Sequence, residues 1–86
     1  MKTIVLDGAV LARRQTALAL LDRALPLPPW WGRNLDALCD CLTPPPQPLC
    51  LVVYHTTALR ATPFGQRLLW VLQDAAAPAL RLRLLG

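Results

Sequence analysis

The 86-residue sequence predicts an α/β fold, in which a small three-stranded parallel sheet is packed with three to four helices. Strand-like apolar runs occur near the start, the middle and the end of the chain, and apolar residues at helical spacing fill the two intervals between them. Strands that alternate with helices favour parallel pairing, because each helix carries the chain back across the sheet. We expect residues 1–86 to form a single domain, since a chain of this length buries roughly 60–70% of its unfolded surface.

The first part of the chain is predicted to form a strand and a helix. Residues 3–6 are β-branched or apolar and precede the turn signal Asp7-Gly8, which is typical of a strand that ends in a tight turn. From about Arg13, leucine and alanine recur at helical spacing. Pro26 cannot continue a helix, so this first helix is expected to end before it.

A second helix is predicted from residue 35 to about residue 43, with two distinct stripes. Asn34 is suited to cap its N-terminus, because the asparagine side chain accepts from the free amides of the first turn, and Pro44 ends it. The stripe expected to be buried consists of Leu35, Leu38 and Leu42. The second, polar stripe consists of Asp36, Asp40 and Thr43.

The second half of the chain is predicted to contain two strands and one long helix. Residues 49–54 form the uninterrupted apolar run LCLVVY, which predicts a central strand covered on both faces. A short helical turn is expected near residues 57–61, and Thr62-Pro63 is a cap followed by proline at the first helical position. Residues 80–84 alternate between leucine and arginine, so the last strand should have one face in solvent.

The charge pattern does not indicate binding to nucleic acid. All five acidic residues are aspartates, whereas the nine Lys and Arg residues give a formal net charge of +4. The arginines are scattered and accompany no RNA- or DNA-reading motif, so we expect a solvated surface and no direct nucleic-acid partner. A small RNA-binding module that uses these arginines is the third and weakest functional hypothesis.

Catalysis is not expected from this composition. The chain has no serine, no glutamate, one histidine and no glycine-rich phosphate loop. Cys50 and His55 are one candidate for a catalytic pair, but a buried thiol and a histidine at a strand end are the expected interpretation. Asp36 and Asp40 are a candidate for paired carboxylates or a metal site, but a helical metal pair normally has ligands from a neighbouring element and only Asp74 is available, so we expect no metal and no cofactor.

The cysteines and the apolar segments predict a cytoplasmic protein. The three cysteines have no zinc-site spacing and are expected to be free thiols in a reducing compartment. The apolar run after Lys2 is interrupted at Asp7 and is too short for a signal peptide. Four prolines interrupt the uncharged stretch of residues 41–59, so no membrane span is expected.

The stretch WWGRNLDALCDCLT, residues 30–43, combines adjacent tryptophans with two aspartates one helical turn apart. Asp36 is favoured near a helix N-terminus, but Asp40 is opposed by the helix dipole and repelled by Asp36. The repulsion is only about 0.2–0.5 kcal/mol, so an ordinary solvated face remains one explanation. Adjacent residues of an extended segment point in opposite directions, so we expect one of Trp30 and Trp31 in the core and the other at the surface. A tryptophan beside clustered carboxylates is typical of a protein-binding hot spot.

These residues also resemble a known family. The run Leu27-Pro28, Trp30-Trp31-Gly32, Asn34-Leu35-Asp36-Ala37-Leu38 and Asp40-Cys41-Leu42-Thr43 resembles the signature of the barstar family, and Val5-Leu6-Asp7-Gly8 fits its first strand. Barstar is the intracellular inhibitor of the secreted bacterial ribonuclease barnase. The resemblance implies the barstar-like fold, a non-catalytic function, and an inhibitor or immunity protein for an extracellular or toxin-type bacterial ribonuclease. It further implies a 1:1 complex and a monomer when free.

The resemblance also assigns expected roles to individual residues. Asp40 would enter the phosphate-binding site of the nuclease, Asp36 would assist it from one turn earlier, and Trp30 would pack on the catalytic histidine. Asp74, on the later helix, would make a peripheral acidic contact. The remaining residues at contacting or supporting positions are Trp31, Gly32, Asn34, Leu35, Cys39 and Thr43.

Four features depart from the family pattern. The first is that a second acidic residue of the late helix is missing near Pro78. The net charge is +4 although barstar is acidic, Cys39 replaces an aromatic residue, and Pro44-Pro45-Pro46 replaces an aromatic-bearing loop. These departures leave a second hypothesis open, in which a barstar-like scaffold binds a non-nuclease toxin or a regulator.

Overall fold

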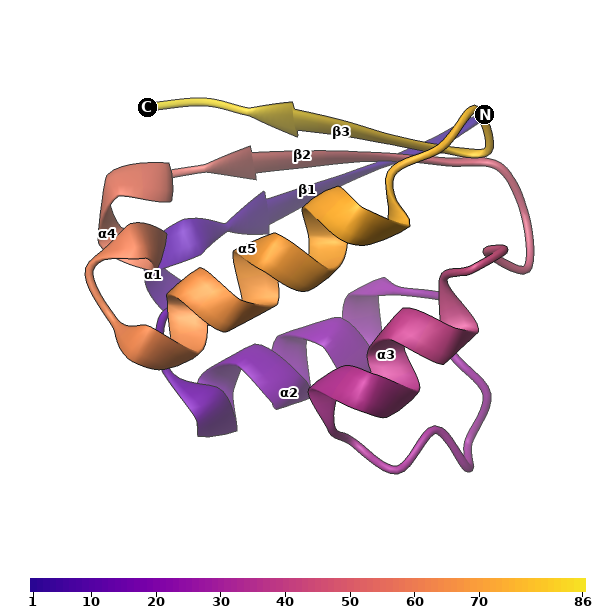
Figure 1. Ribbon diagram of the computed structural model, residues 1–86, viewed down its shortest axis with the longest axis horizontal. Helices are drawn as coiled ribbons and strands as arrows, with labels where there is room; N and C mark the ends of the chain where they lie inside the picture. The colour runs from indigo at the N-terminus through magenta and orange to yellow at the C-terminus, as the bar shows by residue number, and fades with distance from the viewer.

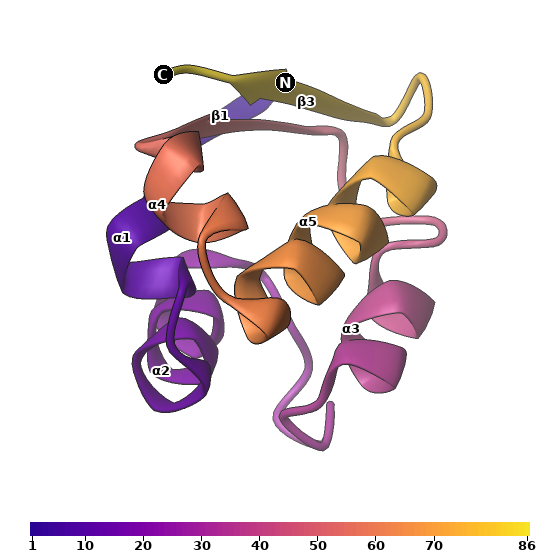
Figure 2. The same cartoon turned by 60° about the vertical axis from the view of Figure 1, so that its left-hand side comes forward.

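The computed structural model describes residues 1–86 and contains three parallel strands and five helices. In chain order the elements are β1 (Lys2–Asp7), α1 (Gly8–Leu11), α2 (Arg14–Ala24), α3 (Leu35–Cys41), β2 (Leu49–Tyr54), α4 (Thr56–Arg60), α5 (Pro63–Ala75) and β3 (Leu80–Leu84). All the helices lie on one side of the sheet (Figures 1 and 2). The predicted α/β class and the three-stranded parallel sheet are therefore confirmed.

The strands pair in the order β1-β2-β3, so the middle strand of the sequence is also the middle strand of the sheet. Lys2 is opposite Leu49, and Leu49 is opposite Leu80, which sets all three strands in register from their first residues onward. The carboxyl ends of the strands therefore meet at one edge of the sheet.

The prediction that β2 is covered on both faces is wrong. Its side chains alternate between buried (Leu49, Leu51, Val53) and half-buried (Cys50, Val52, Tyr54), and no helix lies on the second side of the sheet (Figure 2). The neighbouring Val5 of β1 is 60% exposed on that side. An apolar run shows which residues a strand contains, but not how many layers cover the sheet.

The structure has one helix more than the three to four that the sequence predicts. The Asp7-Gly8 turn signal begins the four-residue helix α1, in which the Asp7 side chain accepts a hydrogen bond from the Ala9 amide at 2.9 Å. A helix of one turn is too short to show a periodic apolar pattern, which explains the omission. α3 ends at Cys41, two residues before the predicted limit at Thr43.

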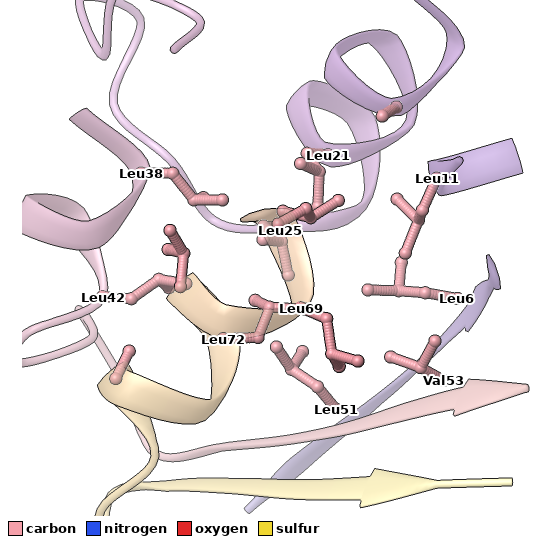
Figure 3. Close-up of a cluster of buried hydrophobic side chains, with 14 of the residues drawn as sticks. Leu6, Leu11, Leu21, Leu25, Leu38, Leu42, Leu51, Val53, Leu69 and Leu72 are labelled. Atoms are coloured by element: carbon pink, nitrogen blue, oxygen red, sulfur yellow. The ribbon is translucent and has the colours of Figure 1, made fainter. Parts of the chain in front are cut away.

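The core lies between the sheet and the helices, with α5 at its centre. Leu69 and Leu72 of α5 lie between Leu51 of β2 on one side and leucines of α2 and α3 on the other (Figure 3). Both residues belong to a cluster of 20 buried apolar side chains. α3 packs against α5 on the side away from the sheet (Figures 1 and 2). The placement of α3 therefore depends on that of α5.

The start of α5 is fixed by a cap and by a close approach of two segments. The Thr62 hydroxyl accepts from the Gly65 amide at 3.0 Å and donates to the Ala12 carbonyl at 2.7 Å, which ties α5 to the end of α1. A Cβ atom at Gly65 would collide with the backbone carbonyl oxygen of Leu59. The glycine is therefore needed for space, because the carbonyl of Leu59 occupies the position of a side chain.

We expect Gly65→Ala to destabilise the protein, although alanine is the better helix former by about 1 kcal/mol. Overpacking costs about 1–3 kcal/mol, so the free energy of unfolding should fall by about 1–2 kcal/mol in urea titrations. Gln73→Ala, at an exposed position of the same helix, is the matched control and should change it by less than about 0.5 kcal/mol. A Gly65→Ala protein more stable than wild type would contradict the packing described here.

Candidate partner-binding site

The loop before α3 is shaped by its own polar contacts. Asn34 caps the helix, as predicted, because its Oδ1 atom accepts from the Ala37 amide at 2.7 Å. Gly32 and Arg33 both have positive φ angles, of 79° and 52°, a region in which glycine is unstrained. The two left-handed residues turn the chain from the tryptophans into the helix.

α3 presents its polar stripe to solvent because its apolar stripe is buried. Leu38 and Leu42 are fully buried and Leu35 is 8% exposed, as the leucine spacing predicts. Asp36, Asp40 and Thr43 are exposed. A helix held by three leucines on one side thus fixes the direction in which both aspartates point.

The two adjacent tryptophans have different environments, and this prediction is confirmed. Trp31 is 2% exposed, and its indole Nε1 donates to Oδ1 of Asp22 at 3.0 Å. Trp30 is 82% exposed. Trp31 and Leu35 are therefore buried parts of the loop and of α3 that hold the exposed residues in place. Of the two tryptophans, only Trp30 offers its side chain to a partner.

Asp22 of α2 has a role that the sequence does not reveal. Its second carboxylate oxygen, Oδ2, pairs with Nη2 of Arg33 at 3.0 Å, so one carboxylate holds both Trp31 and Arg33. These partners are nine and eleven residues away along the chain, beyond the proline-rich segment. No local spacing indicates such a contact. Because Arg33 is exposed, the ion pair itself contributes at most about 1 kcal/mol, and its main effect is to position the loop.

The structure separates the five aspartates into two groups. Asp7 and Asp22 are engaged by partners within the chain, namely Ala9 and His55 for the first and Trp31 and Arg33 for the second. Asp36, Asp40 and Asp74 have no hydrogen bond or ion pair through their carboxylates. The free acidic groups of the chain are thus confined to α3 and the neighbouring α5.

Other candidate positions serve α3 itself. The Thr43 hydroxyl donates to the Cys39 carbonyl at 2.7 Å, so it satisfies a backbone acceptor at the end of α3. Cys39 is half-buried, and its Sγ atom lies 4.0 Å from the Thr43 hydroxyl. Asp74 is exposed on α5, the helix that packs beside α3 (Figures 1 and 2).

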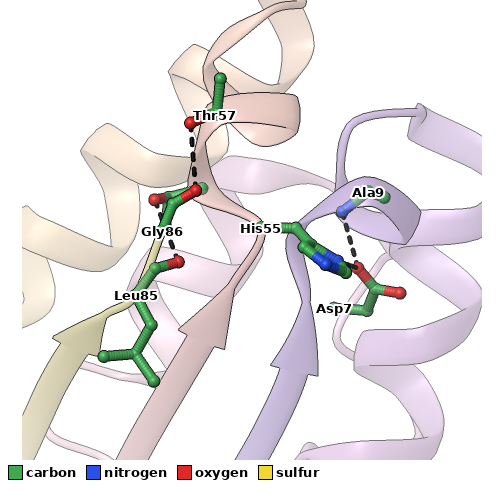
Figure 4. A network of polar contacts seen from close by, with 7 residues as sticks. Asp7, Ala9, His55, Thr57, Leu85 and Gly86 are labelled. Carbon is green, nitrogen blue, oxygen red and sulfur yellow. Dashed lines mark hydrogen bonds and ion pairs between the residues drawn. The ribbon is translucent and has the colours of Figure 1, made fainter.

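The structure does not form the Cys50–His55 pair. Cys50 lies within β2 and His55 follows its end, so they are separated by about 16 Å of extended chain. His55 instead pairs through Nδ1 with Asp7 at 3.1 Å (Figure 4). Cys50 is half-buried on the uncovered face of the sheet, so the expectation of a buried thiol is wrong. No group of three metal-ligating side chains comes together.

Asp7 joins β1, α1 and the residue after β2 at the carboxyl edge of the sheet (Figure 4). The hydrogen bond from His55 is the larger cause, and the Ala9 amide the second, of a lowered pKa of the Asp7 carboxyl. The Thr57 hydroxyl donates to the Gly86 carbonyl at 3.0 Å, which fastens the end of the chain beyond β3 to α4. These contacts lie at an edge of the sheet and do not involve α3.

A family model described as Barstar (barnase inhibitor) matches residues 1–83 of the chain. The chain belongs to the barstar family. The match includes β1, β2, all five helices, the loop that carries Trp30 and β3 as far as Arg83. Barstar-family proteins are inhibitors and not enzymes. The search of the curated proteins gives no significant match.

None of the helices has the length and apolarity needed to cross a membrane.

Asp40 should reduce the stability of the isolated protein, because it lies near the C-terminal end of α3, where no basic residue offsets the dipole. We expect Asp40→Asn to raise the free energy of unfolding by about 0.5 kcal/mol, measured by urea titration at low ionic strength.

Asp36→Asn is the matched control, because it removes the same repulsion but also a favourable charge in the first turn. Its stability should stay at or below that of wild type. A stabilisation equal to that of Asp40→Asn would show that the dipole is not the cause.

The lowered pKa of Asp7 makes its contribution to stability dependent on pH. The contribution is present above the pKa of the unfolded carboxyl and is lost as pH falls through the lower, folded pKa. Asp7→Asn should therefore be less stable than wild type at neutral pH, and the difference should close between about pH 5 and pH 2. Urea midpoints across this range measure it, and a difference independent of pH would contradict the pairing.

Proposed function

We propose that this protein inhibits an extracellular or toxin-type bacterial ribonuclease by occupying its active site in a 1:1 complex. The observation that carries the proposal is the confinement of the unpaired aspartate carboxylates to α3 and α5, with Asp36 and Asp40 one turn apart on α3 and the exposed Trp30 in the loop that precedes this helix. Membership of the barstar family supports a ribonuclease as the partner.

The aspartates would act as mimics of RNA phosphates. Residues four apart on a helix have Cβ atoms about 5–6 Å apart, so the two carboxylates can face neighbouring cationic groups of one cleft. Arginine side chains that bind phosphate also bind carboxylate, with charge-assisted hydrogen bonds in both cases. In this proposal Asp40 enters the phosphate site and Asp36 assists it from the preceding turn.

Trp30 would supply the apolar part of the contact. An indole that is 82% exposed in the free protein has most of its surface left to bury in a complex. Its position is restricted on both sides, by Pro28-Pro29 before it and by the buried Trp31 after it, whose amide donates to the Pro28 carbonyl at 3.1 Å. A pre-positioned aromatic loses little conformational entropy on binding.

The biological role would be that of an immunity protein or antitoxin acting in the cytoplasm of the producing bacterium. The reaction would be blocked by exclusion of RNA, so neither a catalytic group nor a cofactor is needed. The chain would be a monomer before it meets the enzyme.

A second candidate, a barstar-family module for a non-nuclease toxin or regulator, is favoured by Cys39 and by the net charge of +4. The half-buried Cys39 offers less apolar contact than an aromatic residue at that position. A chain with a net positive charge is attracted to a basic enzyme less strongly than an acidic inhibitor would be.

We expect the purified protein to inhibit a barnase-type ribonuclease stoichiometrically, and Asp40→Ala to weaken inhibition by a factor of at least about 30. Removal of one member of a buried charge pair costs about 2–5 kcal/mol, a range for which barnase and barstar are themselves a standard example. Enzyme activity titrated with each variant measures the inhibition constant.

Thr3→Lys is the matched charge control, because it adds the same unit of positive charge on the uncovered face of the sheet. It should leave inhibition within about threefold of wild type. An inhibition constant of Asp40→Ala within about threefold of wild type would refute the mimicry, and no inhibition by wild type would favour the second candidate.

A further inference from the structure

Trp70 is a second large apolar side chain that the fold leaves in solvent. It lies on α5 and is 64% exposed, whereas the α5 leucines at positions 68, 69 and 72 are buried in the core. Its indole therefore does not stabilise the folded chain as a core residue does. The sequence gives no indication of its role, because it lies outside the stretch that resembles the family signature.

The indole borders a small groove between α3 and α5. The groove has a volume of about 180 Å³ and is lined by Leu35, Asp36, Arg67, Trp70 and Val71. Leu35 and Val71 are each only 8% exposed, so they form an apolar floor on which Trp70 stands as a wall. Asp36 and Arg67 provide opposite charges at its rim, without an ion pair between them.

We propose that this groove receives an apolar side chain from the same ribonuclease, so that the contact surface extends from α3 onto α5 through Trp70. The inference rests on the proposed function and adds a specificity-determining residue to it. The groove is continuous with the proposed contact surface, because Asp36 belongs both to the polar stripe of α3 and to the lining of the groove.

The chemistry of the groove selects the kind of side chain it receives. The opposite charges of Asp36 and Arg67 leave no net charge at the rim, so the groove does not favour a cation or an anion. Its apolar floor and indole wall favour a leucine, methionine or aromatic side chain, which would lose its hydration on entry. If the nuclease carries such a residue beside its cationic cleft, the complex would have a hot spot in which an apolar side chain fills the groove and the aspartates pair with the cationic groups.

The test compares three variants of α5 with wild type in inhibition assays. Trp70→Ala should raise the inhibition constant about tenfold or more, and Trp70→Phe should keep most of the affinity because the ring still covers the groove. Gln73→Ala, exposed on the same helix but outside the groove, should change it less than about threefold. Asp40→Ala is run in parallel to report on the proposed function.

A second readout follows Trp70 directly. The chain is labelled with 5-fluorotryptophan, and its three ¹⁹F resonances are assigned with Trp30→Phe and Trp70→Phe variants. Addition of the unlabelled barnase-type ribonuclease should shift the Trp70 resonance. It should also abolish the difference between the chemical shifts of this resonance in H2O and in D2O. The buried Trp31 serves as an internal control and should not change.

The outcomes separate the two proposals. Inhibition that depends on Asp40 but not on Trp70, with an unchanged Trp70 resonance, overturns the inference and leaves the proposed function standing. Absence of inhibition by wild type overturns both. A Trp70 resonance that shifts with the concentration of the free chain shows that a second copy covers the groove, which also overturns the inference.

Discussion

The packing of α5 between the sheet and α3 is the constraint on which the rest of the structure depends. Its buried side chains face the sheet on one side and the leucines of α2 and α3 on the other (Figure 3). Because α3 packs on α5 and lies away from the sheet, the direction of its aspartates is set through α5. Buried residues of α5 thus determine the geometry of the candidate surface. A loss of packing around Leu72 would change the positions of Asp36 and Asp40.

The second support of the surface is polar and comes from α2. The Asp22 carboxylate holds Trp31 and Arg33, and these residues flank Gly32, which has a positive φ angle. The buried indole of Trp31 requires a partner for its N–H group, which explains why a carboxylate lies there. The exposed Trp30 is the residue before Trp31 in the chain, so the anchoring of Trp31 also restricts the backbone of Trp30. Both hydrogen bonds of the Asp22 carboxylate therefore serve to position the loop.

The sequence predicts most of the fold, because the strands and the longer helices have strong periodic patterns and clear caps such as Asn34 and Thr62. It fails where a pattern carries no information about layers or long-range contacts. The run of residues 49–54 does not show that one side of the sheet is bare, and α1 is too short to show a period. In the candidate site, the exposure of Asp36, Asp40 and one tryptophan follows from spacing. The bond between Asp22 and Trp31 and the groove beside Trp70 depend on tertiary structure, which no local pattern contains.

The uncovered face of the sheet also affects how the molecule is charged. Arg81 and Arg83 stand exposed on β3, while Asp36, Asp40 and Asp74 stand on α3 and α5 in the helical layers. α3 itself carries two exposed aspartates and no basic residue, so the surface is locally acidic there although the net charge of the chain is +4. Salt would screen the overall repulsion from a basic partner beyond a Debye length, about 10 Å at 0.1 M salt, and within that distance the partner would attract the acidic face of α3. Orientation during encounter, and not attraction from a distance, would then govern the approach of such an inhibitor to its enzyme.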